Sequence, residues 1–176
     1  MIALAPREDK KELIIENALI VFAEKGYYKA TTAMVAKAAG VTQPYVFHFF
    51  ENKEELFKVA IDRAFRRLYD RFSEVDSPAD QMIQMMSGMF NEVKQTHRDE
   101  VLMLMQAHAI ADAGIREHVR GLFLNIYESL ALKFERAGIA NAKERAAQFI
   151  GTGLLITVSE VLDLPQLVQG CGDECC

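Results

Sequence analysis

The sequence predicts an all-α fold with a small N-terminal head of three helices joined to a larger helical body. Apolar residues recur three and four positions apart through most of the 176 residues, as in Leu122, Ile126 and Leu130. Glycines and prolines fall between these periodic segments, where helices begin and end. Near the N-terminus, two periodic segments are very short. Helices of about two turns are not stable alone in water, so they must pack against longer ones.

The two short helices are expected within residues 31–50. Thr31 is a candidate N-cap for the first, because its hydroxyl can accept from free N–H groups of the opening turn. Gly40 stands where a helix often ends in the left-handed conformation. Thr42 is the next candidate N-cap, and Pro44 follows in the first turn, where a missing N–H is harmless. This pattern is typical of a helix-turn-helix, whose second helix presents its N-terminal residues to the major groove.

Three segments carry a resemblance to a known family: FAEKGYYKATT (22–32), VAKAAGV (35–41) and TQPYVFHFFENKEELF (42–57). Together they resemble the TetR (tetracycline-repressor-like) family of bacterial transcription regulators. The A-G-V turn alone would also suit a tight corner in an ordinary helical bundle. The resemblance implies a DNA-binding head over residues 1–52. It also implies a ligand-binding and dimerisation body over residues 53–169, with the helix after residue 52 linking the two.

The helix-turn-helix pattern and the resemblance together select the residues expected at DNA. Gln43 is the candidate for base readout, because an amide can bond adenine bidentately. Lys53 opens the next helix, where free N–H groups favour a backbone phosphate. Phe47 stands where family members commonly carry tyrosine, so one phosphate-bonding hydroxyl is missing. The predicted DNA-binding set is Thr31, Thr42, Gln43, Pro44, Tyr45, Phe47, His48 and Lys53.

The charge of the chain opposes this interpretation. The formal net charge is −5, whereas DNA-binding proteins usually show a basic footprint. Residues 1–56 hold seven lysines and arginines against eight aspartates and glutamates. We therefore expect cations on the DNA side of the head and carboxylates behind it. The alternative is a helical small-molecule-binding or carrier protein whose head does not bind DNA.

Methionines concentrate on two successive helices in the body, the second expected to end near Gly114. Methionine is pliable and polarizable, so it suits a surface that fits varied apolar molecules. The alternative is that these methionines simply fill the hydrophobic core. We predict an apolar small-molecule effector oriented by a polar group such as Gln106. The predicted ligand-binding set is Met82, Met86, Met89, Phe90, Met103, Gln106, Phe123 and Tyr127.

In the family, the last two helices of each protomer form the dimer interface. Here a helix expected over residues 141–162 carries an apolar stripe together with glycines that allow close helix approach. The predicted interface set is Phe149, Ile150, Gly153, Leu154 and Thr157. After Pro165 too little chain remains for a full final helix, which departs from the family pattern. A homodimer must then rely on residues 115–137 and 141–162, or have a smaller interface than is usual in the family.

Several other classes lack sequence support. No apolar run is long enough to span a membrane and no signal-peptide layout is present, so we expect a cytoplasmic protein. Neither a glycine-rich phosphate loop nor an HExxH pattern is visible, so we expect no enzyme and no cofactor. Cys171, Cys175 and Cys176 are too few for a four-ligand zinc site, and we predict a disordered tail over residues 170–176. The expected function is a repressor released from a palindromic operator by an apolar molecule.

Overall fold

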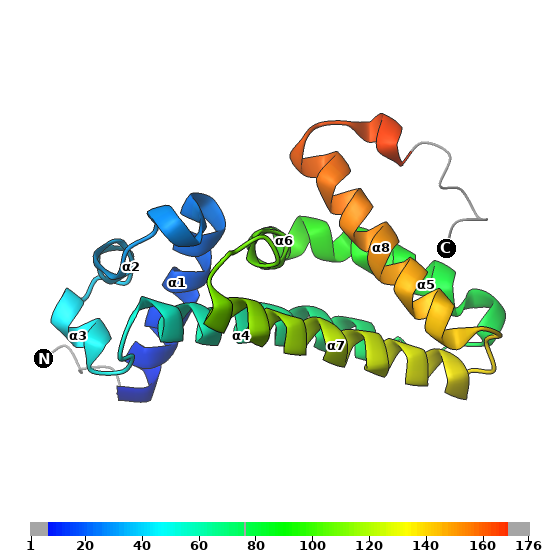
Figure 1. The fold of residues 1–176 in the computed structure, drawn as a ribbon, viewed down its shortest axis with the longest axis horizontal. Helices are drawn as coiled ribbons and strands as arrows, with labels where there is room; N and C mark the ends of the chain where they lie inside the picture. The colour runs from blue at the N-terminus through cyan, green and yellow to red at the C-terminus, as the bar shows by residue number, and fades with distance from the viewer. Residues whose placement is uncertain (1–6, 76, 169–176) are drawn as a thin grey trace, which may run out of the picture.

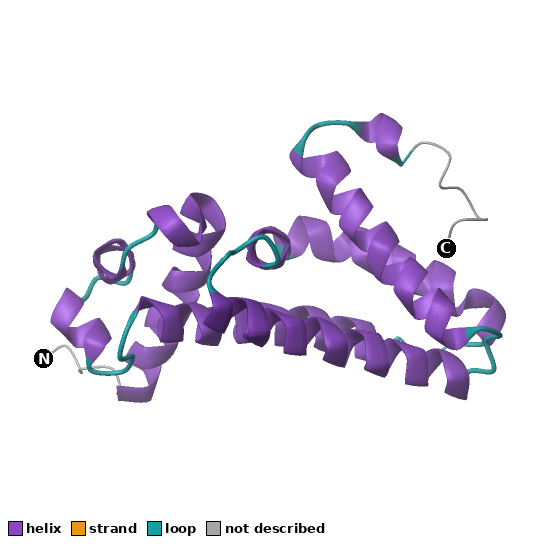
Figure 2. Ribbon diagram, in the orientation of Figure 1, coloured by secondary structure: helices purple, strands orange, loops and turns teal. Residues whose placement is uncertain are grey.

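The computed structural model describes residues 7–75 and 77–168, and the regular elements in those ranges are helices (Figures 1 and 2). The head consists of α1 (Arg7–Lys29), α2 (Thr32–Ala38) and α3 (Gln43–Phe47). The body follows as α4 (Lys53–Ser73), α5 (Ala79–Thr96), α6 (Arg98–Ala107), α7 (Ala113–Arg136), α8 (Ala142–Val161) and the 3-10 turn η1 (Pro165–Leu167). The predicted all-α architecture is confirmed. The cysteine tail over residues 170–176 lies outside the described residues.

Local signals explain how the head turns its corners. The helical conformation of α1 is interrupted at Gly26, whose φ of 72° suits a residue without Cβ. The Thr31 side chain accepts a hydrogen bond from the Met34 N–H at 3.2 Å, which confirms that N-cap. Thr42 is the N-cap residue of α3, as predicted, but its hydroxyl makes no capping hydrogen bond. The Thr42 carbonyl instead accepts from the N–H of Tyr45 at 3.0 Å.

One helix boundary differs from the sequence prediction. α6 ends at Ala107 rather than near Gly114. The Asp112 carboxylate accepts from the Ile115 N–H at 3.0 Å, and this cap begins α7 at Ala113. Gly114 therefore lies in the first turn of α7. The side-chain cap decides the boundary, which apolar periodicity alone did not locate.

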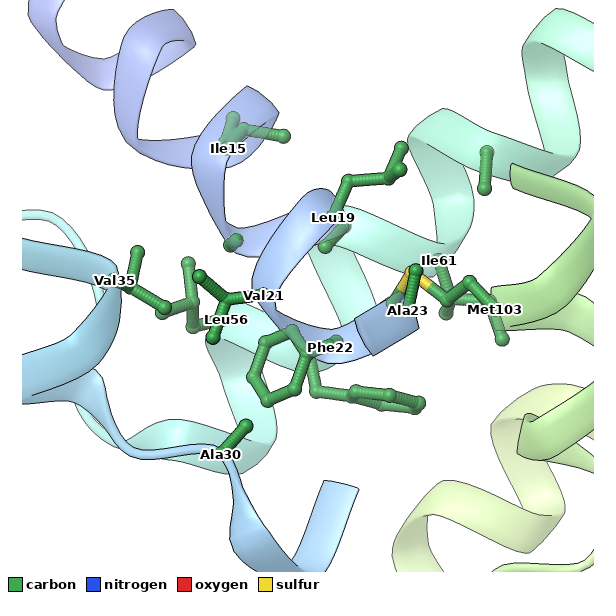
Figure 3. Packing of buried hydrophobic residues seen from close by; sticks show 14 of the residues in the cluster. Ile15, Leu19, Val21, Phe22, Ala23, Ala30, Val35, Leu56, Ile61 and Met103 are labelled. Carbon is green, nitrogen blue, oxygen red and sulfur yellow. The ribbon is translucent and has the colours of Figure 1, made fainter. Parts of the chain in front are cut away.

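The core of the head extends into the body. Buried apolar residues from α1, α2, α4 and α6 form one cluster, part of which Figure 3 shows around Phe22, Leu56 and Met103. The rings of Phe22 and Phe57 meet edge to face with centroids 5.0 Å apart. The first half of α4 thus belongs to the head by packing. The proposed division between residues 52 and 53 stays a prediction.

α4 and α7 run side by side in the same direction, from the head to the far end of the body (Figure 1). His118 on α7 contacts Asp62 on α4, with Nε2 and Oδ1 2.6 Å apart. Farther along, Lys133 of α7 reaches the last turn of α4, where its Nζ donates to the carbonyl of Ser73 at 3.0 Å. Helices α5, α6 and α8 complete the body. In the described part of the chain, no helix is both long and apolar enough to cross a bilayer.

Candidate DNA-binding head and ligand cavity

Helix α3 lies at the end of the molecule away from α8 (Figure 1). Val46 and Phe50 anchor it, since both are buried in the head. Four of the predicted residues, Thr42, Gln43, Pro44 and His48, are exposed, and Phe47 is 47% exposed. Tyr45 is half-buried, and its ring stacks on His48 with centroids 6.1 Å apart. The predicted residues of α3 therefore share one exposed end of the head.

The amide of Gln43 is held by α2. Its Nε2 donates to Oγ1 of Thr32 at 2.8 Å, and Thr32 is itself buried. An amide has two N–H donors and one carbonyl acceptor, so Oε1 and one N–H of Gln43 are left for other partners. A donor and acceptor side by side is the pattern that matches the major-groove edge of adenine.

Lys53 has a structural partner that the sequence did not reveal. Its ammonium donates to the carbonyl oxygens of Tyr27 at 2.9 Å and Ala30 at 3.3 Å, and it lies 4.3 Å from the centroid of the Tyr27 ring. Burial raises the pKa of Tyr27, and the charges of Asp112 and Glu54 add to that rise. Lys53 thus fastens the start of α4 to the end of α1 and to the connector that follows it. One of its three N–H groups remains for a phosphate.

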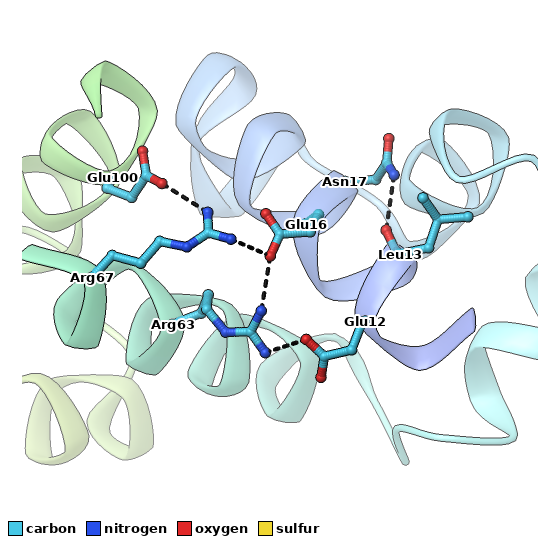
Figure 4. A network of polar contacts seen from close by, with 7 residues as sticks. All are labelled: Glu12, Leu13, Glu16, Asn17, Arg63, Arg67 and Glu100. Atoms are coloured by element: carbon cyan, nitrogen blue, oxygen red, sulfur yellow. Dashed lines mark hydrogen bonds and ion pairs between the residues drawn. The ribbon is translucent and has the colours of Figure 1, made fainter. Parts of the chain in front are cut away.

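Carboxylates of α1 are paired with arginines of α4 (Figure 4). Arg63 bridges Glu12 and Glu16, while Arg67 bridges Glu16 at 2.6 Å and Glu100 of α6 at 2.9 Å. Although burial lowers the pKa of Arg67, the hydrogen bonds to Glu100 and Glu16 raise it overall above its ordinary value. Part of the acidic charge of the head is therefore neutralised within the protein. This pairing reduces the charge conflict noted in the sequence.

The body contains a partly open cavity of about 690 Å³ between α4, α5, α6, α7 and α8. This volume falls within the range of roughly 300–1,000 Å³ found for small-molecule sites. Aromatic residues of α4 form much of one wall, and the Phe72 ring stacks on Phe90 with centroids 6.1 Å apart. The apolar lining suits a ligand that carries a large hydrophobic part.

Three of the eight predicted ligand residues line this cavity: Met82, Phe90 and Phe123. Met86 and Met103 are fully buried in the two core clusters, where they fill space, as the alternative interpretation of the methionines states. Met89 and Tyr127 pack beside the body core and are not in the lining. Gln106 faces the head instead, and its Nε2 donates to the Ala23 carbonyl at 2.7 Å.

The stripe on α8 that we assigned to the dimer interface faces the same cavity. Each of its members is part of the lining: Phe149, Ile150, Gly153, Leu154 and Thr157. A Cβ at Gly153 would lie 3.6 Å from the Phe90 ring, an ordinary contact distance, so α8 lies against α5 at this point. An apolar stripe signals burial, but it does not identify the covering surface.

Sequence reasoning missed the contribution of α4 and the two cations of α7 to the cavity. Phe65, Tyr69 and Phe72 of α4 line it at spacings of four and three, a helical pattern that was readable in the sequence. Lys133 and Arg136 of α7 bring cations to the lining. No local pattern marks these two residues, because only the tertiary fold places them beside the end of α4.

Comparison with known proteins identifies the family. The model of the bacterial regulatory proteins of the tetR family matches residues 14–60, which include the helix-turn-helix of α2 and α3. The chain belongs to the TetR family. It is therefore a DNA-binding transcriptional regulator of an all-helical class, and the family is one of regulators rather than enzymes.

Curated relatives of this TetR-family chain are also regulators. It is 23% identical over 137 residues to the biofilm operon icaADBC HTH-type negative transcriptional regulator IcaR of Staphylococcus epidermidis, covering 76% of this chain and 74% of the relative. It is 26% identical over 132 residues to the fatty acid metabolism regulator protein of Bacillus subtilis, covering 71% of this chain and 68% of the relative.

Solved structures share the fold of this TetR-family chain over most of its length. A TetR transcriptional regulator from Chloroflexus aurantiacus superposes with a TM-score of 0.76 at 18% identity, covering 93% of this chain and 90% of that one. FadR from Bacillus subtilis, solved in complex with stearoyl-CoA, gives a TM-score of 0.68 at 18% identity, covering 86% and 88%.

Proposed function

We propose that this TetR-family regulator is a ligand-responsive repressor, released from a palindromic operator by an apolar small molecule that carries a fatty acyl chain. The observation that carries the proposal is the apolar cavity of about 690 Å³ in the body. The relatives support the acyl class, since one is a fatty acid metabolism regulator and FadR binds stearoyl-CoA. A carrier without DNA binding is the competing function.

The DNA half of the proposal rests on α3. Two heads of a dimer would enter successive major grooves, which are about 34–36 Å apart. Gln43 would read a base, while Tyr45 and His48 would contact bases or backbone. Thr31, Thr42, Pro44 and Phe47 would lie along the groove wall. Lys53 would use its remaining N–H on a phosphate.

Coupling between the ligand and the head would run through α6. Val101, Leu104 and Met105 of this helix line the cavity. The same helix bonds the head directly through Gln106, whose Nε2 donates to the carbonyl of Ala23 in α1. It also bonds the head indirectly through Glu100, which accepts from Arg67 of α4, and Arg67 in turn donates to Glu16 of α1. A ligand shifts the head only if it binds two arrangements of these contacts with different affinities.

The dimer would use the face of α8 that points away from the cavity. Gly151, Leu155 and Leu162 lie on it, at helical spacings of four and seven, and all three are exposed. A Cβ added at Gly151 would meet no atom within 4 Å, so a partner helix has room to approach. The inward stripe from Phe149 to Thr157 would then serve the ligand rather than the partner.

Selection of bound fragments from random DNA tests the function. We expect enrichment of a two-fold-symmetric site and release of that site on addition of palmitoyl-CoA. Gln43→Ala is the matched control for the head, since it removes the amide from an exposed position. Tight palmitoyl-CoA binding without any enriched DNA site would overturn the proposed regulator function and favour the carrier function. An enriched site that palmitoyl-CoA leaves bound would overturn the effector class alone.

A further inference from the structure

The cavity is chemically different at its two ends. Lys133 and Arg136, three residues apart on α7, bring positive charge to the end that Ser73, Val75 and Ser77 also line. Elsewhere the cavity is lined by apolar side chains, among them Val101 and Leu104 of α6 and Phe123 of α7. A ligand with one charged end and one apolar end therefore meets complementary surfaces in one orientation and mismatched surfaces in the other.

Lys133 is held in place at the charged end. Its Nζ donates to the carbonyl oxygens of Phe72 at 3.2 Å and Ser73 at 3.0 Å, both in the last turn of α4. A cation at that position also meets the negative end of the helix dipole. Two of the three N–H groups are used, so one is left for an anion inside the cavity. Phe72 lines the same cavity, which places the ammonium beside its apolar wall.

The two ends of the cavity are separated along α7. This helix runs from the head, where His118 contacts Asp62, to the far end, where Lys133 contacts the end of α4. From Phe123 to Arg136 is thirteen residues, or about 20 Å at the rise of an α-helix. Figure 1 shows α6 near the head and the end of α7 far from it. The charged end of the cavity therefore lies away from the DNA-binding head.

We propose that the effector is an anionic amphiphile that binds in one orientation. Its carboxylate or phosphate lies at Lys133 and Arg136, and its apolar chain points along the cavity toward α6. A free fatty acid and an acyl-CoA offer this same chemistry. The inference rests on the proposed function, and it adds the polarity of the ligand and the residues that fix it.

The orientation makes the response depend on chain length. Only a chain long enough to reach Val101, Leu104 and Met105 contacts α6, the helix that bonds the head. Shorter anions occupy the Lys133 end without that contact. They bind, but they leave the operator complex intact.

Affinity measurements on full-length protein test the charged end. Palmitate and palmitoyl-CoA are compared with hexadecanol, a neutral molecule of the same chain length. We expect the wild type to bind at least one of the two anions tenfold or more tightly than the alcohol. Lys133→Met should abolish that preference and leave hexadecanol binding unchanged, and Lys133→Arg should retain it. Lys143→Met, an exposed lysine outside the cavity lining, should behave as wild type.

Three outcomes separate this inference from the proposed function. Equal affinities of wild type for the anions and the alcohol would overturn it while leaving an apolar effector in place. An anion preference that survives Lys133→Met would overturn the role of Lys133. Failure of all three compounds to bind the wild type would overturn the acyl effector and this inference together. Each comparison is a ratio of two binding affinities measured on the same variant. A change in the stability of the variant alone therefore does not produce the expected change in that ratio.

A second variant tests the direction of the chain. Met105→Trp adds bulk at α6, on the apolar side of the cavity. We expect it to weaken palmitate severalfold and to leave octanoate unaffected, because the shorter chain does not reach α6. Equal weakening of octanoate and palmitate, or no weakening of either, would overturn the orientation.

Discussion

At the residue scale, the base-reading amide of Gln43 depends on a buried neighbour. Thr32 accepts one N–H of that amide at 2.8 Å, which fixes the orientation of the remaining N–H and Oε1. We expect Thr32→Val, which keeps the shape and removes the acceptor, to reduce discrimination at one base pair by about 1–3 kcal/mol, like Gln43→Ala. Competition binding with single-base operator variants measures this. Thr32→Ser keeps the hydroxyl and is the control; unchanged discrimination in Thr32→Val would contradict the prediction.

Lys53 is expected to show two separable effects. Lys53→Ala removes two hydrogen bonds from a charged donor, so it should lower the free energy of unfolding by about 1–3 kcal/mol. Loss of its phosphate contact should weaken binding to all sequences alike and reduce the salt slope by about one. Urea unfolding and salt titration measure the two effects. Lys37→Ala, an exposed lysine of α2, is the stability control. A change in base preference would contradict a backbone role.

At the element scale, α4 joins the head to the body through charged contacts of unequal burial. Arg67 pairs with Glu100, whose side chain is only 9% exposed, whereas Arg71 pairs with the exposed Glu92 and Glu74. Removing one partner of a buried pair leaves an uncompensated charge, and removing an exposed one costs little. The three-helix connection of α1, α4 and α6 therefore depends more on Arg67 than on Arg71.

A matched pair of variants on α4 tests this difference. Arg67→Leu should destabilise the protein by about 3 kcal/mol, since Glu100 is left buried without its cation. Arg71→Leu, one turn later, should cost about 0–1 kcal/mol, because its pairs are solvent-screened. Chemical denaturation followed by circular dichroism gives both values. Equal losses for the two variants would show that burial of Glu100 does not set the strength of the connection.

At the scale of the whole molecule, DNA binding by two heads requires a dimer. Leu155 is 38% exposed on the face of α8 that points away from the cavity. We expect Leu155→Glu to yield monomers in analytical ultracentrifugation, because a carboxylate would be buried against the partner helix. Operator affinity should fall with dimerisation, since a monomer occupies one half-site. Met85→Glu, at an exposed site on α5, should remain dimeric; a dimeric Leu155→Glu protein would place the interface elsewhere.

Local sequence signals determined the architecture of this protein. Periodicity and capping residues gave the all-α class and the positions of the short helices, because these features depend on neighbours within one or two turns. Thr31 and Gly40 behave as their positions predicted, with a cap bond and a φ of 64°. The family resemblance pointed to the same head. In the structure, α3 of that head carries the candidate DNA-binding surface.

The tertiary structure decided which surface covers each apolar stripe. The stripe from Phe149 to Thr157 lines a cavity, whereas Met86 and Met103 are buried in the core and lie outside the lining. Lys53 and Lys133 bond carbonyl oxygens of distant segments, 23 to 26 and 60 to 61 residues away in sequence. Hydrophobicity is non-directional, so a sequence records that a side chain leaves water but not what it meets. Only the packing of whole helices settles that.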